Sequence, residues 1–270
     1  MNLEPQIPEM PTPPTATVVA PPLISPPPIP AAAPTKFVWG FWLTLAFGAL
    51  VAGAFVAVQS VIAIIFIGVY AITGHKHSVE SLSSDGLLVS VATCCSAPVV
   101  IGLSVFLAWL RRGLPVKAYF ALKPVTLKMV LLSFAALIGV YVLWAAAVKF
   151  FNLPEIPQFM LDVYRTARFL PLLWVAIVLA APAAEECLFR GFLFQGLMHS
   201  RVGPTGAVLL TSFLWAVIHL QYGWVEITFI FLLGLALGCI RWKSGSIWLP
   251  FLIHSVSNLI ATLELALLDK

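Results

Sequence analysis

The sequence has 270 residues, of which 61% are apolar and 10% charged, with a mean hydropathy of +1.01 and a formal net charge of +4. Soluble domains are about 45–50% apolar and about 25% charged, so this composition excludes a water-soluble fold and predicts an integral protein of the cell membrane. The basic residues lie mostly at the ends of apolar runs, where they act as topology signals, and they do not indicate a nucleic-acid partner.

Residues 1–35 differ in composition from the rest of the chain. Twelve of the 21 prolines fall in this segment. Proline lacks a backbone N–H and favours extended conformations, so the segment is predicted to be a disordered tail. It has no charged region leading into a continuous apolar run, and is therefore not a signal peptide.

Three uncharged or nearly uncharged runs follow the tail, and about 20 residues suffice to cross a bilayer core as a helix. Residues 37–74 are long enough for one tilted span with an extension, or for a span and a re-entrant piece. Residues 86–110 predict a second span with a kink at Pro98. Residues 129–150 predict a third.

The fourth apolar segment, residues 169–200, is predicted to be one long kinked helix with its acidic residues near the middle. Three more spans are predicted at residues 205–221, 225–240 and 247–267. Gly234 and Gly238 form a Gly-x-x-x-Gly pattern that permits close helix packing. The prediction is an all-α bundle of seven spans, with an eighth if residues 37–74 cross twice or residues 169–200 divide in two.

Seven spans place most of the basic loop residues on one side of the membrane. By the positive-inside rule that side is cytoplasmic, so the N-terminus is predicted to be cytoplasmic and Lys270 to lie on the other side. The residues that carry this prediction are Arg111, Arg112, Lys117, Lys123, Lys128, Arg201, Arg241 and Lys243.

Several polar residues lie inside these spans, where a charge costs several kcal/mol. Glu186 and Arg190 are four residues apart, so they share a helix face and are predicted to pair. Glu185 is turned away by about 100° and is predicted to be a carboxylate without a partner. Pro182 is predicted to loosen the helix and to open a backbone carbonyl or a water site.

His219, His254 and Asn258 lie in the later spans, and the last two share one helix face. Each alone is consistent with a packing contact between helices. Together with Glu185 they also suit chemistry, because Glu and His act as general bases, both bind metals, and His and Asn stabilise an oxyanion. All four are predicted to converge in one hydrated cavity that opens towards Arg201 and Lys243.

The pattern Glu185-Glu186-x-x-x-Arg190, then a histidine that ends a helix, then His254-x-x-x-Asn258 resembles the CPBP family of intramembrane proteases. This family comprises CAAX prenyl endopeptidases and bacteriocin-processing or self-immunity proteins, also called Abi. The resemblance covers about residues 169–267. One position departs from it, because Trp215 stands where the family has phenylalanine, and an altered pocket shape is expected there rather than altered chemistry.

The resemblance implies a membrane protease with N-terminal transmembrane helices over residues 36–168 and a catalytic core over residues 169–267. Its substrate would be a peptide or a protein, prenylated or not. By the same resemblance, Glu185 and His219 activate water, His254 and Asn258 stabilise the oxyanion, and Glu186 with Arg190 supports the site. A zinc ion on Glu185, His219 and His254 and a metal-free mechanism both remain open.

Two other functions compete with the protease. A catalytically inactive scaffold or binding protein of the same fold would need none of the four site residues. A transporter or proton relay also uses buried Glu and His, but the chain shows no internal repeat of the transporter type.

Overall fold

A computed structural model of the chain describes residues 38–73, 79–154 and 156–268. These residues form helices joined by turns and short connections, and no strand occurs among them. The predicted all-α membrane fold is confirmed. The predicted tail, residues 1–35, lies outside the described residues.

Six helices in the described part of the chain are long and apolar enough to cross a membrane. They are α1 (Phe41–Ile72), α3 (Gly86–Leu110), α5 (Leu127–Phe151), the continuous run Leu170–Met198, α11 (Trp224–Ser244) and α12 (Trp248–Leu268). Short helices α2 (Val79–Ser83), α4 (Val116–Tyr119) and α6 (Gln158–Thr166) lie between them. Helix α1 is continuous from Phe41 to Ile72, and the run Leu170–Met198 is continuous as well.

The seventh apolar helix, α10 (Gly203–Val217), is shorter than the sequence predicts. Its 15 residues span about 22 Å at 1.5 Å per residue, less than the roughly 30 Å hydrocarbon core. The chain leaves the helix after Val217 and forms a turn over residues 218–222. His219 therefore lies in this turn and not within the helix.

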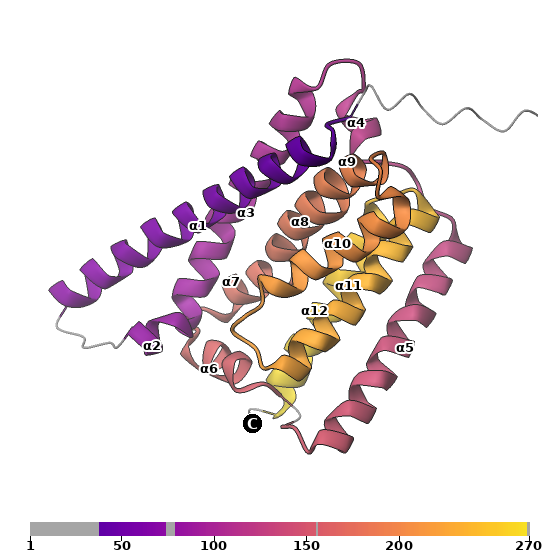
Figure 1. Cartoon of the computed structure of the whole chain (residues 1–270). Coiled ribbons are helices and arrows are strands. Elements are labelled where there is room, and N and C mark those ends of the chain that lie inside the picture. Colours follow the sequence, from indigo (N-terminus) through magenta and orange to yellow (C-terminus); the bar gives the residue numbers. More distant parts are fainter. Residues whose placement is uncertain (1–37, 74–78, 155, 269–270) are drawn as a thin grey trace, which may run out of the picture. The chain divides into compact units, whose positions relative to one another are not determined.

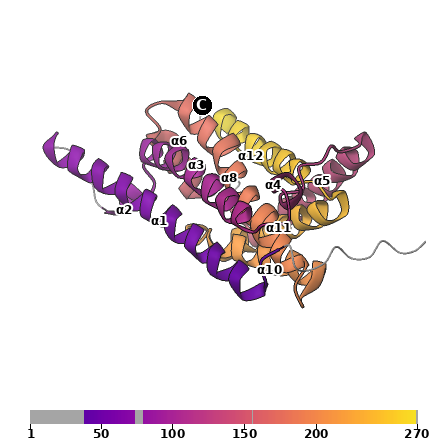
Figure 2. The same cartoon turned by 90° about the horizontal axis from the view of Figure 1, so that it is seen from above.

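The central helices lie between α1 on one flank and α5 on the other (Figures 1 and 2). Helix α1 packs on α3, and α5 packs on α11 and α12. Helices α10 and α11 approach closely, as the Gly-x-x-x-Gly pattern predicts. A Cβ at Gly234 would lie 3.1 Å from Trp215 Cε3, and one at Gly238 would lie 3.1 Å from Val208 Cγ1.

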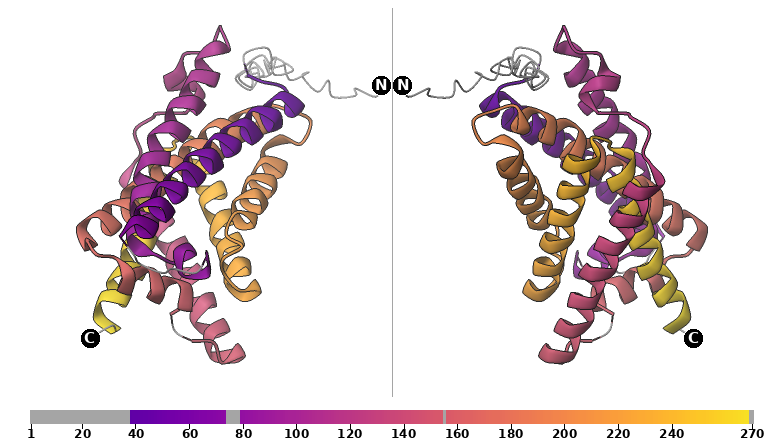
Figure 3. Two further views of the ribbon diagram at one scale, coloured as in Figure 1. Left: turned by 90° about the vertical axis from the view of Figure 1, so that its left-hand side faces the viewer. Right: turned by 90° about the vertical axis from the view of Figure 1, so that its right-hand side faces the viewer.

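The two ends of the bundle carry different elements. Helices α5 and α12 both end at the same end of the bundle (Figure 3). Helix α11 starts at that end, since only Gly245–Ile247 join its far end to the start of α12. Lys243, in the last turn of α11, is therefore at the opposite end.

Candidate active site

The helix that carries the acidic pair changes its winding around them. Helix α8 (Ala181–Glu186) lies between two π-helical segments, η2 (Val175–Ala180) and η3 (Cys187–Leu193). Such π-turns are rare and often mark functional sites. The helix therefore continues without a break from α7 (Leu170–Trp174) to α9 (Phe194–Met198). Its winding changes from α-helical to π-helical on both sides of Glu185.

Pro182 explains how the last helix attaches to this segment. The N–H of Ala181 donates to the carbonyl of Ala176, five residues earlier. With the same spacing of five residues, the backbone N–H of residue 182 would donate to the Ile177 carbonyl. Pro182 has no backbone N–H, so it cannot make this hydrogen bond. The Ile177 carbonyl instead accepts a hydrogen bond of 2.9 Å from Asn258 Nδ2. The predicted open carbonyl is therefore present, and a side chain of α12 occupies it.

The predicted pair of Glu186 and Arg190 is confirmed. Arg190 Nη1 donates to Glu186 Oε1 at 3.0 Å, and both side chains are fully buried. Arg190 Nη2 also donates to the Gly234 carbonyl at 3.1 Å. The ion pair thereby links the rewound helix to α11.

His254 lies between the two glutamates. Its Nδ1 is 2.9 Å from Glu186 Oε1, and its Nε2 is 3.9 Å from Glu185 Oε2. The first contact is a hydrogen bond that fixes the ring, while the second distance is too long for one. Nε2 therefore remains available for a group bound beside Glu185.

Glu185 has a partner, so the prediction of an unpartnered carboxylate is wrong. Trp215 Nε1 donates a hydrogen bond to Glu185 Oε2. The Trp215 ring also lies under the Arg190 guanidinium, with 4.7 Å from Cζ to the ring centroid. From the sequence, Trp215 was expected only to alter the shape of the pocket. The usable signal was the indole N–H, a donor that the phenylalanine of the family lacks.

His219 is oriented by the turn in which it lies. Its Nδ1 is 2.7 Å from the Trp215 carbonyl oxygen. A carbonyl oxygen only accepts, so Nδ1 carries the proton and Nε2 of the neutral ring is a free base. Because α10 ends at Val217, His219 lies in the turn that follows, and its basic nitrogen is not used in packing.

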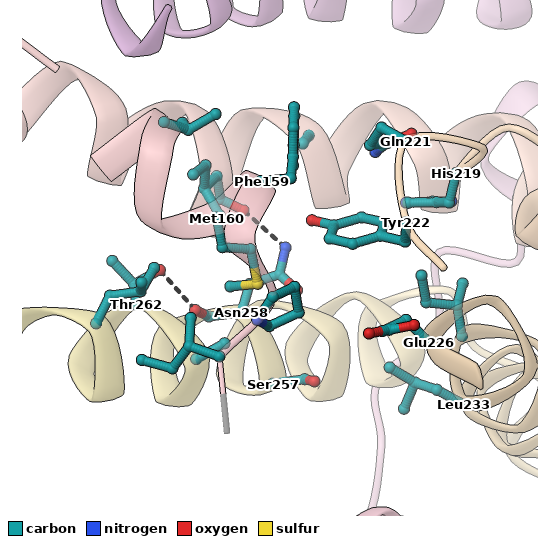
Figure 4. A pocket seen from close by; sticks show the side chains of 18 of the residues that line it. Phe159, Met160, His219, Gln221, Tyr222, Glu226, Leu233, Ser257, Asn258 and Thr262 are labelled. Carbon is teal, nitrogen blue, oxygen red and sulfur yellow. Dashed lines mark hydrogen bonds between the residues drawn. The ribbon is translucent and has the colours of Figure 1, made fainter. Parts of the chain in front are cut away.

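The structure brings Glu185, His219, His254 and Asn258 to one pocket of about 320 Å³, part of which is shown in Figure 4. Glu185 lies midway along Leu170–Met198, so the pocket reaches the middle of the membrane-spanning region. The side chain of Glu185 is 22% exposed, enough for water to reach it.

The pocket is at the other end of the bundle from the one predicted. Its lining includes the first turns of α3, the second half of α5, α6, the 218–222 turn, the first half of α11 and α12 from His254 to Leu265, and neither Arg201 nor Lys243 lines it. At the end with Lys243, Arg241 is buried, and it donates to the Arg190 carbonyl at 2.9 Å and to Gln195 Oε1 at 3.3 Å.

The zinc ligands suggested by the sequence are not arranged as a metal site. Among the residues that the structure describes, no three His, Cys, Asp or Glu side chains are grouped so that they could hold one ion. Nδ1 of His254 is bound to Glu186 and Nδ1 of His219 to a backbone carbonyl, so only the Nε2 atoms of the two rings are open to a further partner.

A comparison with known protein families gives a match that falls on this site. Residues 167–260 match the family model for the Rce1-like type II CAAX prenyl endopeptidases. The matched segment contains Glu185, His219, His254 and Asn258, and it confirms the resemblance found in the sequence. No curated protein and no solved structure matches the chain. The match supports an intramembrane protease as the class of protein.

Proposed function

We propose that this protein is an intramembrane endopeptidase that hydrolyses a peptide bond of a peptide or protein substrate. One observation carries the proposal. Glu185 and His219, two groups that can take a proton from water, share one pocket within the membrane with His254 and Asn258. The family match supports the same class of reaction.

In the proposed reaction, Glu185 takes a proton from a water molecule, with His219 Nε2 as its second hydrogen-bond partner. The water oxygen attacks the carbonyl carbon, and the carbonyl electron pair moves to the oxygen. The second amide hydrogen of Asn258 stabilises this oxyanion, and Nε2 of His254 does so when its ring carries a proton on both nitrogens. The intermediate collapses, the C–N bond breaks, and the proton on Glu185 passes to the departing amine.

The buried pair beneath the pocket positions these groups. Glu186 holds His254 by Nδ1, and Arg190 holds Glu186. Neither Glu186 nor Arg190 lines the pocket. We therefore assign both to positioning and not to proton transfer.

The topology proposed from the sequence bears on how the substrate arrives. If the end with Arg201 and Lys243 is cytoplasmic, the pocket opens at the other face of the membrane. An apolar groove of about 440 Å³ adjoins the pocket, and Tyr141 lines both. The groove is formed by α5 and α12, and it offers room for a prenyl chain or apolar side chains of the substrate.

The test uses purified protein in lipid nanodiscs and a mixture of apolar peptides that includes a farnesylated CAAX peptide and its unprenylated counterpart. We expect cleavage products by mass spectrometry with the wild type and none with Glu185→Gln. Glu226→Gln is the matched control, because Glu226 lines the same pocket but is not part of the site. Folded wild type that cleaves none of the peptides would favour the scaffold function.

A further inference from the structure

The pocket contains a tyrosine that the proposed reaction does not use. Tyr222 follows α10 in the same turn as His219 and lines the pocket. Figure 4 shows its hydroxyl pointing into the pocket, in the direction of Met160 and Asn258. Within the described residues this hydroxyl makes no hydrogen bond. Tyr141, in the same pocket, differs because its hydroxyl is bound to Ser257.

The Tyr222 ring is held by aromatic neighbours. It stacks on His219 with 6.3 Å between centroids and 25° between planes, and it meets Phe159 edge-on at 5.5 Å. The backbone N–H of Tyr222 donates to the His219 carbonyl at 3.1 Å. The turn that orients His219 therefore also fixes the position of a free hydroxyl group.

The other two oxyanion donors come from one side of the pocket and are already partly used. His254 and Asn258 both lie on α12. One His254 nitrogen is bound to Glu186, and one Asn258 amide hydrogen is bound to Ile177. An oxyanion held only by the remaining donors would be contacted from α12 alone. Tyr222 approaches from the turn between α10 and α11 and could contact it from another direction.

We propose that Tyr222 is a further catalytic residue, whose hydroxyl donates a hydrogen bond to the oxyanion formed on the substrate carbonyl. This role rests on the proposed peptidase function. The step leaves the proton on the phenol oxygen throughout, so Tyr222 stabilises charge and is neither the acid nor the base.

The surroundings of Tyr222 keep it a donor. Burial raises the pKa of this phenol above its usual value, and the nearby Glu185 and Glu226 carboxylates raise it further. A phenol with a raised pKa stays protonated at all working pH values. Removing the hydroxyl should therefore lower the rate without changing the shape of the pH profile.

The experiment compares Tyr222→Phe with Tyr164→Phe, which removes a hydroxyl from another tyrosine of the pocket lining. Loss of one oxyanion donor typically lowers kcat by about 100-fold to 1000-fold, so we expect about a 100-fold lower kcat for Tyr222→Phe and a KM within about twofold. Tyr164→Phe should retain the wild-type rate, and both variants should unfold at the wild-type temperature.

A second measurement separates catalysis from packing. A phosphinic peptide presents a tetrahedral anionic centre, and its affinity should fall in Tyr222→Phe by about the same factor as kcat. Affinity for the intact peptide, measured in the Glu185→Gln background, should stay unchanged.

Three outcomes overturn the role of Tyr222. If the wild type cleaves, Glu185→Gln does not, and Tyr222→Phe cleaves at the wild-type rate, the peptidase function stands and Tyr222 has no catalytic part. Equal losses of affinity for the phosphinic and the intact peptide would make Tyr222 a packing residue. If the wild type cleaves no peptide, the peptidase function fails and this role fails with it.

Discussion

Trp215 donates its indole N–H to the carboxylate of Glu185, although the two residues are 30 positions apart in the sequence. The same ring contacts His254 edge-on, with 5.1 Å between centroids. Trp215 thus fixes the direction in which the proposed base presents its oxygens, and the indole N–H carries this function because a phenylalanine ring has no donor.

The first prediction concerns this hydrogen bond. Trp215→Phe keeps the aromatic contacts with Arg190 and His254 but removes the donor to Glu185. A hydrogen bond to a charged group contributes about 1.5–3 kcal/mol, so we expect kcat to fall about 10-fold to 100-fold with little change in KM. Trp144→Phe, at another tryptophan of the pocket, is the control and should cleave normally. A wild-type rate for Trp215→Phe would show that the indole does not position Glu185.

The second prediction concerns stability. Arg190→Met leaves the buried Glu186 without its counter-charge, and removing one partner of a buried pair costs roughly 3–5 kcal/mol. We expect a clearly lower unfolding temperature in detergent, monitored by tryptophan fluorescence. Adding Glu186→Gln to Arg190→Met should recover part of the loss, because the unpaired charge is then gone. A single variant as stable as the wild type would contradict the importance of the pair.

The third prediction concerns Pro182. Pro182→Ala restores an N–H that can reach the Ile177 carbonyl and compete with Asn258 for it. We expect a higher unfolding temperature, since proline inside a helix costs about 3 kcal/mol. We also expect a lower kcat, because the orientation of the Glu185 carboxylate changes. In a double-mutant cycle, Asn258→Ala should cost less stability beside Pro182→Ala than in the wild type. Additive effects would mean that Pro182 and Asn258 do not share this carbonyl.

Local patterns in the sequence were sufficient to predict much of this architecture. Apolar runs predicted the long helices, because the bilayer requires them whatever their partners. The spacing of Glu186 and Arg190 predicted their ion pair, because residues four apart share a face of one helix. Pro182 indicated a free carbonyl for the same local reason.

Contacts between distant segments could not be predicted in this way. Trp215 reaches Glu185, and His254 reaches Glu186 over 68 positions, only through the packing of separate helices. The sequence also did not predict correctly the end of the bundle at which the pocket opens. Arg241 is buried at the opposite end, and a charged residue in a sequence does not reveal whether it faces water or the interior.

The fourth prediction is the orientation in the membrane. With the four native cysteines replaced by serine or alanine, a cysteine at exposed Gln221 should react with an impermeant maleimide added outside cells. A cysteine at Lys243 should react only after permeabilisation, because positive loops stay in the cytoplasm. Reporter fusions after Lys128 and after Lys270 should report opposite sides. Labelling of Lys243→Cys from outside would reverse the orientation, and with it the side from which the substrate arrives.

The fifth prediction concerns the charge of the substrate near the bond that is cleaved. The pocket lining includes Glu185, Glu226 and Glu264, and none of its described lining residues is Lys or Arg. A free C-terminal carboxylate close to the scissile bond would therefore meet like charges, which cost about 1–4 kcal/mol at about 4 Å depending on the local dielectric. We expect a C-terminally amidated peptide to be cleaved with about tenfold higher kcat/KM than the same peptide as a free acid. Glu226→Gln should reduce this difference in kcat/KM between the two peptides, because it removes a negative charge from the pocket. Added salt should reduce it as well, because salt screens the repulsion between the carboxylates. A preference for the free acid would show that a cation reaches the bound C-terminus, and the substrate would then resemble a CAAX peptide in presenting its carboxylate to the site.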